Sequence, residues 1–322
     1  MTSPAAESGD ASSPTRGFAG RPGAPALWIG AAIAAVIGAL LVIAGVRAFG
    51  PATPEPQVRR FAISVPQLTL EMRRPARISP DGRFLLFSSG NHLSVRDLER
   101  FEPMDVAGTD GATSYFWSHD SRRIGYFKDG KLRAADLSGT NAAPLCEFPA
   151  GDDIHNGDWG PDDNIVFARY LEGLYVVPAN GGEPRLLLQR DSTEVDFHHP
   201  EFLPDGRHIL VVAHRKRGPN AVLSVSYPEG TLKNLGEFER LNAARYAPSG
   251  HLFLTYEHGA QEVRAVPFSA SRVEITGPAV FTLPGALYPT VSHDGTLAYG
   301  LDLEILLVQN WAEELKKPAA GK

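Results

Sequence analysis

Ser79-Pro80-Asp81-Gly82-Arg83 decides the fold of this 322-residue chain, because a turn of the same kind recurs five more times. The further copies are Ser118–Arg122, Gly160–Asn164, Leu203–Arg207, Ala247–His251 and Ser292–Thr296. The third residues of the six copies are Asp81, Asp120, Asp162, Asp205, Ser249 and Asp294, at intervals of 39, 42, 43, 44 and 45 residues. Six copies at a nearly constant period predict a repeat protein.

The motif has the chemistry of a tight turn. Its proline sets φ near −65°, its aspartate bonds to the nearby backbone, and its glycine supplies the positive φ that lets the chain return. We therefore expect the six third residues to be structural turn residues and not a functional ring.

Short runs of β-forming residues follow each motif. Phe84–Phe87 follows the first copy, and a second run, His92–Leu98, comes after a further turn. Four short strands in about 42 residues are typical of a propeller blade. The sequence predicts an all-β fold, a six-bladed β-propeller over residues 59–316. We expect Phe61–Val65 to close the ring by pairing with Ile305–Asn310 as the outer strand of blade six.

The N-terminal part differs in composition from the repeats. Residues 1–25 are rich in Ala, Ser, Gly and Pro and are expected to be a disordered tail. Residues 26–48 are largely apolar and long enough to span a bilayer, which predicts one transmembrane helix. A secretory signal peptide is the competing interpretation, but its apolar region is usually shorter. A Pro-rich linker follows at 49–58, and residues 317–322 are read as a second tail.

Composition narrows the function classes. The net charge is −6, and the 31 basic residues are scattered, so we expect no nucleic-acid partner. The single cysteine, Cys146, excludes an intramolecular disulfide framework and any site built from a cysteine pair. We expect no cofactor and no metal, and we assign no catalytic residue.

Several segments carry a resemblance to known proteins. The Ser-Pro-Asp-Gly-Arg motif with its following strand resembles the TolB-type, WD-like propeller repeat of bacterial envelope proteins. Phe116–Arg122, Gly181–Pro184 and Pro200–His208 are similar to the propeller that follows the transmembrane helix of some bacterial receptor-type serine/threonine protein kinases. The sequence departs from those kinases because it contains none of their catalytic motifs.

The resemblance implies a location that the charge pattern does not fix. It implies a single-pass protein of the inner (cytoplasmic) membrane, with a cytoplasmic N-terminus and an extracytoplasmic propeller. The basic residues on the two sides of residues 26–48 give no clear orientation by themselves.

Candidate binding residues gather in the loops that join one blade to the next. All such loops emerge at the same mouth of a propeller channel, which is our predicted binding place. The candidates are Asp152, Asp153, His155, Glu194, Asp196, His198, His199, Asn242 and Tyr288. Adjacent residues of a strand point to opposite faces, so His198 and His199 are not expected to share a metal ion. The basic run His214–Arg217 is predicted to form a solvated hairpin tip.

These observations favour a non-catalytic module of the cell envelope that docks a protein or senses a small ligand. One alternative is the detached or truncated sensor half of a receptor-type serine/threonine kinase. Another is a propeller hydrolase or lyase that acts on envelope carbohydrate or peptide.

Overall fold

The computed structural model describes residues 24–49, 56–65, 68–69, 75–149, 153–256, 261–301 and 304–316. Two compact units make up the chain, Met1–Glu55 and Pro56–Lys322. The predicted tails, most of the predicted linker and Asp152 lie outside the described residues, as does the side chain of His155.

The first unit contains the helix α1 (Ala24–Phe49), whose side chains are described for residues 30–42. It covers the stretch predicted to cross a membrane. Within the described part of the chain, no helix is both long enough and apolar enough to do so.

The strands of the second unit form six antiparallel sheets among the described residues, one for each motif. Blade one contains β2 (Leu68–Thr69), β3 (Arg77–Ile78), β4 (Phe84–Ser89), β5 (His92–Asp97) and β6 (Met104–Asp105). Blade two contains β7 (Thr113–Trp117), β8 (Arg123–Lys128), β9 (Lys131–Asp136) and β10 (Ala143–Glu147). Blade three contains β11 (Ile154–Trp159), β12 (Asn164–Arg169), β13 (Gly173–Pro178) and β14 (Arg185–Gln189).

The other three blades follow the same order from the innermost strand outward. Blade four contains β15 (Glu194–Phe202), β16 (His208–Arg215), β17 (Asn220–Ser226) and β18 (Leu232–Phe238). Blade five contains β19 (Leu241–Ala247), β20 (His251–Tyr256), β21 (Glu262–Ser269), β22 (Glu274–Ile275) and β23 (Phe281–Pro284). Blade six contains β24 (Leu287–Val291), β25 (Leu297–Leu301), β26 (Glu304–Gln309) and, from the other end of the unit, β1 (Arg59–Ile63).

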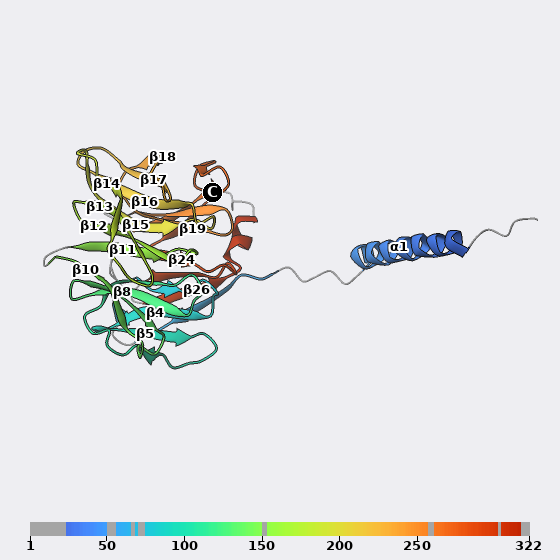
Figure 1. Ribbon diagram of the computed structural model, residues 1–322, viewed down its shortest axis with the longest axis horizontal. Helices are drawn as coiled ribbons and strands as arrows, with labels where there is room; N and C mark the ends of the chain where they lie inside the picture. Colours follow the sequence, from blue (N-terminus) through green and yellow to red (C-terminus); the bar gives the residue numbers. More distant parts are fainter. Residues whose placement is uncertain are drawn as a thin grey trace, which may run out of the picture. The chain divides into compact units, whose positions relative to one another are not determined.

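The pairing of β1 with β26 closes the ring. Phe61 lies opposite Leu307 in this pair, and Ile63 lies opposite Ile305. The predicted closure is therefore confirmed for residues 61–63, the strand also includes Arg59 and Arg60, and Ser64 and Val65 lie beyond it. Figure 1 shows the consequence, because the red C-terminal strands lie beside the blue start of the propeller. A short 3₁₀ helix, η1 (Trp311–Lys316), follows β26.

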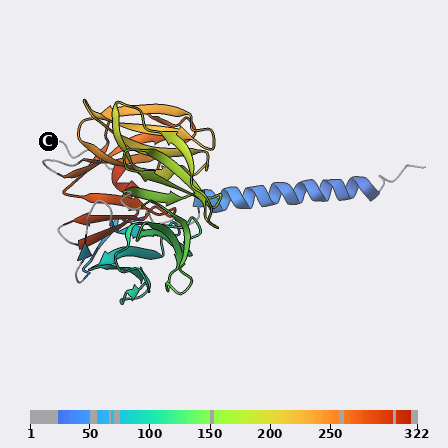
Figure 2. The same ribbon diagram turned by 60° about the vertical axis from the view of Figure 1, so that its left-hand side comes forward.

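The hydrophobic core lies between the blades. Six clusters of buried side chains are described, and each joins two neighbouring blades. Phe116 and Trp159 belong to the cluster between blades two and three, and Leu85 and Ile305 to the one between blades one and six. Burying one such side chain contributes about 1.5–3 kcal/mol. Figure 2 shows the sheets side by side around the ring, which is how their faces cover one another.

The turn motif has the same backbone geometry in all six copies. Its fourth residue has a positive φ each time, at Gly82, Ser121, Asp163, Gly206, Gly250 and Gly295. Its fourth N–H donates to the carbonyl of its first residue in each copy. Ser121 and Asp163 replace glycine and add contacts: Ser121 Oγ accepts from the Asp81 N–H, and Asp163 Oδ1 accepts from Trp159 Nε1.

The third residues of the motifs bond to their own turns. Asp81, Asp120, Asp162, Asp205 and Asp294 each accept from the backbone N–H two residues further on. In the fifth copy, Ser249 Oγ lies 3.1 Å from Nδ1 of His251. These are local turn contacts.

Candidate functional site

The innermost strands of four blades carry a bulge at an equivalent position. Register shifts occur there in β7, β11, β15 and β24. The residue three before the end of each strand has a positive φ, namely Ser114, Asn156, His199 and Tyr288. A bulge inserts a residue and redirects the side chains around it. Successive side chains therefore do not simply alternate between the two faces of the sheet at these four positions.

The innermost strand of each blade has one residue at an equivalent position, which lies two residues beyond the bulge in the four blades that have one, and these six residues line a common cavity. We name this set the axial ring: Arg77, Phe116, Asp158, Glu201, Arg245 and Thr290. Each lies four residues before the third residue of its motif. All six line one cavity of about 150 Å³, the axial cavity.

A second ring borders the axial cavity at the end of the innermost strands that leads into the motifs. It consists of the second residues of the six motifs: Pro80, His119, Pro161, Pro204, Pro248 and His293. The rings of His119 and His293 are 5.4 Å apart, and the His293 N–H donates to the Pro80 carbonyl. The motif thus both turns the chain and builds one end of the cavity.

Several axial-ring side chains bind the next blade. Asp158 Oδ2 accepts from the Phe202 N–H at 2.8 Å, and Glu201 Oε2 accepts from the Tyr246 N–H at 2.9 Å. Thr290 Oγ1 likewise accepts from the Ile78 N–H of blade one at 3.1 Å. The acceptor is always the axial-ring position, and the donor is always the residue after it in the next blade. These side chains therefore link the blades.

The side-chain contacts of the two axial-ring arginines are longer than the hydrogen bonds that Asp158, Glu201 and Thr290 form with the next blade. Arg77 Nη2 lies 3.4 Å from Asn156 Oδ1, and its Nε has no hydrogen-bond partner among the described residues. Arg245 lies 3.5 Å from His199 Nδ1 and 4.0 Å from Glu201 Oε2. Both arginines are buried, with 6% of the residue exposed in each case. Two guanidinium groups are thus held close to the axis without a close ion pair in this part of the chain.

Burial and mutual charge shift the pKa values of this region. Burial raises the pKa of Glu201 to about 7, although the nearby Arg245 opposes the shift. Burial also raises the pKa of Asp158 above its usual range. Burial, aided by Arg245, lowers the pKa of Arg77 to about 9. At neutral pH, the Arg77 guanidinium therefore stays charged and the Glu201 carboxyl is partly protonated.

Of the candidates predicted from the sequence, Glu194, Asn242 and Tyr288 lie at the starts of their innermost strands, away from the motifs. His199 and Tyr288 line a small pocket of about 10 Å³ there, with ring centroids 6.4 Å apart. Glu194 and Asn242 are buried, and Glu194 accepts a hydrogen bond from the nearby Asp191 N–H. The Asp153 carbonyl accepts from the Tyr170 N–H. The axial cavity, at about 150 Å³, is larger than this pocket and is lined by the motif residues.

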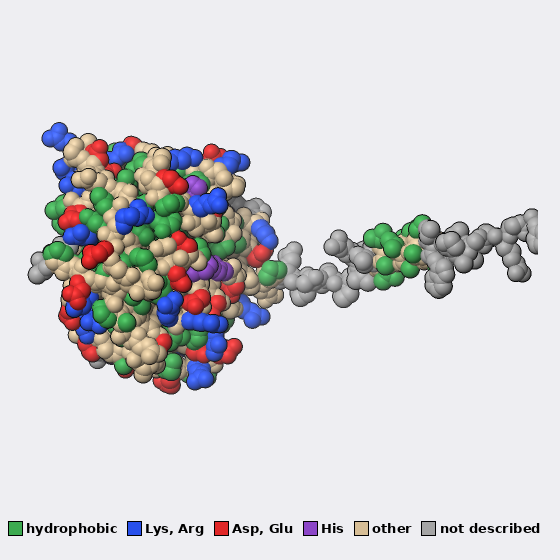
Figure 3. Space-filling view, in the orientation of Figure 1, with side chains coloured by type: hydrophobic (Ala, Val, Ile, Leu, Met, Phe, Trp, Pro, Cys, Tyr) green, Lys and Arg blue, Asp and Glu red, His purple; other side chains and the backbone are tan. Residues whose placement is uncertain are grey.

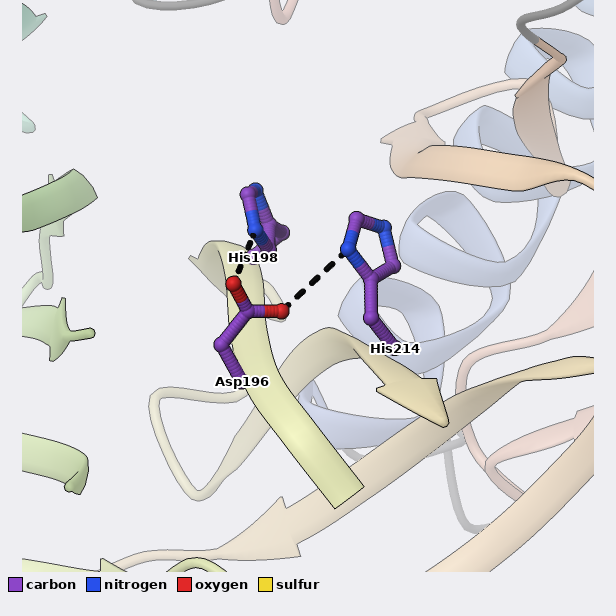
Figure 4. A group of neighbouring side chains, drawn as sticks. All are labelled: Asp196, His198 and His214. Carbon is purple, nitrogen blue, oxygen red and sulfur yellow. Dashed lines mark hydrogen bonds and ion pairs between the residues drawn. The ribbon is translucent and has the colours of Figure 1, made fainter. Parts of the chain in front are cut away.

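The structure also brings together three residues that the sequence did not group. Asp196, His198 and His214 each offer one atom suited to a metal, and these atoms lie within 4.8 Å of one another (Figure 4). His214 was predicted to lie in a solvated hairpin tip, but His214 and Arg215 are the last residues of β16. The hairpin prediction is therefore wrong for these two residues, because the strand extends further than its apolar run.

The axial ring has a sequence signal that a search for loops overlooks. Four charged residues recur at one fixed offset before the motif, within strands whose other residues are mostly buried. The outer surface gives no comparable signal of a binding site on the visible face, because basic and acidic side chains are interspersed there (Figure 3).

Comparisons with known proteins support the fold. No family model matches the chain, and no curated protein matches it. A solved structure of a putative TolB from Agrobacterium tumefaciens is similar, with a TM-score of 0.57 and 17% identity, over 79% of this chain and 99% of that one. A solved structure of a streptogramin B lyase has a TM-score of 0.55 and 11% identity, over 79% of this chain and 97% of that one. A solved structure of an oligogalacturonate lyase in complex with manganese has a TM-score of 0.53 and 12% identity, over 77% of this chain and 80% of that one. At these identities the likeness shows the propeller fold alone.

Proposed function

We propose that this propeller is a non-catalytic ligand-sensing module that binds a small carboxylate-bearing ligand in its axial cavity. The observation that carries this proposal is the pair of buried guanidinium groups of Arg77 and Arg245. Both line the cavity; Arg77 has no ion pair with a described carboxylate, and Arg245 has only the 4.0 Å pair with Glu201.

The hydrogen bonds of the axial-ring carboxylates support a negatively charged ligand. Asp158 and Glu201 already accept hydrogen bonds from the neighbouring blades. A buried cation without a close partner is costly, and a carboxylate satisfies a guanidinium with two parallel hydrogen bonds. A ligand anion would therefore supply the close partner that the protein's own carboxylates do not give to these guanidinium groups.

The size of the cavity sets the size of the ligand. A cavity of about 150 Å³ is comparable to one that holds benzene. The aromatic walls formed by Phe116, Trp117 and Trp159 suit a flat or apolar body beside the charged group. Benzoate is consequently a suitable probe, and benzamide is its uncharged counterpart.

Calorimetric titration of the full chain with these two probes tests the proposal. We expect benzoate to bind and benzamide to bind at least tenfold more weakly, because only the carboxylate pairs with the arginines. Arg245→Gln should weaken benzoate binding to a similar extent, whereas Arg122→Gln, at an exposed turn position, should leave it unchanged. Equal binding of the two probes, or no loss in Arg245→Gln, would contradict the proposal.

A hydrolase or lyase is the second candidate, and one observation favours it. The pKa of Glu201 is raised to about 7, which is suited to a group that exchanges protons at neutral pH. This function requires a substrate that is turned over and a loss of turnover in Glu201→Gln. Binding of an unchanged ligand favours the sensing module instead.

The setting in the cell envelope is part of the same proposal. It is supported by the apolar stretch at residues 26–48 and by the resemblance to extracytoplasmic propellers. An envelope protein remains the alternative partner, and a receptor-type kinase system remains the alternative context. Fractionation of cells into membrane and soluble parts, followed by protease treatment of intact spheroplasts, tests the anchor and the predicted outward orientation.

A further inference from the structure

Asp196, His198 and His214 form a compact group in blade four, which we name the Asp196 group. Asp196 and His198 lie two residues apart on β15, so both side chains point to the same face of the strand. His214 lies on β16, and its backbone is the register partner of Asp196. The hairpin therefore fixes all three side chains from two adjacent strands.

The two imidazole rings converge on one carboxylate. His198 Nε2 lies 2.9 Å from Asp196 Oδ2, and His214 Nδ1 lies 3.2 Å from Asp196 Oδ1. The two rings are stacked, with centroids 4.2 Å apart. Figure 4 shows that each ring turns a nitrogen toward its own carboxylate oxygen.

These separations are close to those within a zinc site. Zn²⁺ binds histidine nitrogen and carboxylate oxygen at about 2.0–2.2 Å, which places neighbouring ligand atoms of a tetrahedral site about 3.3 Å apart. In the Asp196 group, one ligand atom from each of the three residues lies within 4.8 Å of the others. Small side-chain movements are enough to bring the three atoms around one ion.

The burial of the group is uneven in a way that suits a bound ion. The side chains of Asp196 and His198 are 5% and 3% exposed, whereas that of His214 is 24% exposed. The His214 side therefore gives an ion access from solvent. Three protein ligands with a fourth, solvent-accessible position are a common arrangement for zinc.

We propose that Asp196, His198 and His214 bind one divalent transition-metal ion, of which Zn²⁺ is the best match to the donor set. Two imidazole nitrogens and one carboxylate oxygen suit Zn²⁺ and Co²⁺, whereas Mg²⁺ and Ca²⁺ prefer sites built from oxygen alone. The site shares no residue with the lining of the axial cavity, so it stands apart from the proposed ligand site.

The bulge at His199 separates the two adjacent histidines. His199 has a φ of +52° and lies beside Arg245 and Tyr288 at the axis. His198 instead faces Asp196 and His214. In the proposed site, the second histidine ligand, His214, comes from the neighbouring strand.

Metal titration of the full chain, stripped with a chelator and then dialysed, tests the site. We expect one equivalent of Zn²⁺ to bind in calorimetry, Co²⁺ to give a visible absorption band that Zn²⁺ abolishes, and Mg²⁺ to give no heat of binding. The melting temperature should rise when Zn²⁺ is added, because the ion binds the folded chain.

Two variants and a matched control locate the ion. His214→Ala and Asp196→Asn should each weaken Zn²⁺ binding at least 100-fold, and His214→Ala should fold well because this side chain is partly exposed. His208 lies on the same strand and pairs with Asp205, 2.7 Å away, but the pair has no third ligand in the described structure. His208→Ala should therefore keep the wild-type affinity.

Three results would overturn the proposal. The first is a folded wild-type chain that takes up no Zn²⁺ and gives no Co²⁺ band. The second is unchanged Zn²⁺ affinity in a His214→Ala protein whose circular dichroism is that of the wild type. The third is an equal loss of affinity in His208→Ala, which would move binding to surface histidines.

Discussion

The carboxylate of Asp158 in blade three accepts a hydrogen bond of 2.8 Å from the backbone N–H of Phe202 in blade four. Glu201 repeats the relationship one blade further on, with the N–H of Tyr246. The same strand position that faces the axis therefore also ties each of these blades to its neighbour. The proposed ligand site therefore shares residues with the contacts that link the blades, and substitution tests both roles.

Replacing Asp158 tests the link between blades three and four. Asp158→Ala leaves the Phe202 N–H without this acceptor, which should lower the free energy of unfolding by about 1–3 kcal/mol. Asp158→Asn keeps an acceptor oxygen and should cost less than half as much. Urea denaturation measures both values, and equal losses in the two variants would mean that the hydrogen bond is not the stabilising contact.

Replacing Ile63 tests the closure of the ring. Ile63 on β1 is 6% exposed and packs in the cluster that joins blades one and six, whereas Phe61 on the same strand is 47% exposed. Ile63→Ala should lower the free energy of unfolding by about 2–4 kcal/mol, and Phe61→Ala by less than about 1 kcal/mol. If Phe61→Ala proved as damaging as Ile63→Ala, the described packing of β1 would be wrong.

Glu201 should make stability depend on pH. Its pKa rises from 4.5 to about 7 on folding, so the folded chain binds a proton more tightly than the unfolded chain between these values. The free energy of unfolding should therefore fall as pH increases from about 4.5 to 7, by about 2–3 kcal/mol.

Glu201→Gln should remove this slope because the amide cannot ionise and still offers an oxygen to the Tyr246 N–H. Glu229→Gln, at an exposed position, is the matched control and should retain it. Urea denaturation at a series of pH values measures the slope. A wild-type slope in Glu201→Gln would assign the effect to another group.

Ligand binding should depend on the same ionisation. Above pH 7 the charge of Glu201 lies beside Arg245 and competes with a ligand anion, so benzoate affinity should fall about 3–10-fold between pH 6 and 8. Calorimetry at several pH values measures the change. Glu201→Gln should bind benzoate with nearly constant affinity over this range, and an unaltered pH profile in that variant would separate Glu201 from the binding site.

The blade count and the closing strand were predictable from the sequence because they depend on local chemistry. The motif at Ser79–Arg83 encodes one tight turn, and the spacing of its copies leaves room for four strands. The pairing of β1 with β26 follows from the shortage of one strand in blade six.

The binding region was harder to predict because it depends on bulges and on contacts between blades. Asp196 and His198 were identified as candidates, but their partner His214 belongs to a strand end that reads as a basic turn. The bulge at His199 breaks the alternation on which a prediction of side-chain direction relies. Arg77 and Arg245 are 168 residues apart in sequence, and only ring closure brings them to one cavity.

Nuclear magnetic resonance of the arginine side chains tests the central claim most directly. The Arg77 Nε–H group lies beside the axial cavity, and its nitrogen has no hydrogen-bond partner in the described structure. In full-length chain carrying ¹⁵N-labelled arginine, with the Arg77 signal assigned by Arg77→Lys, benzoate should shift that signal in a saturable way and benzamide should not. An Arg77 signal that stays in place while benzoate binds elsewhere, or equal shifts with both probes, would contradict a carboxylate site at the axis.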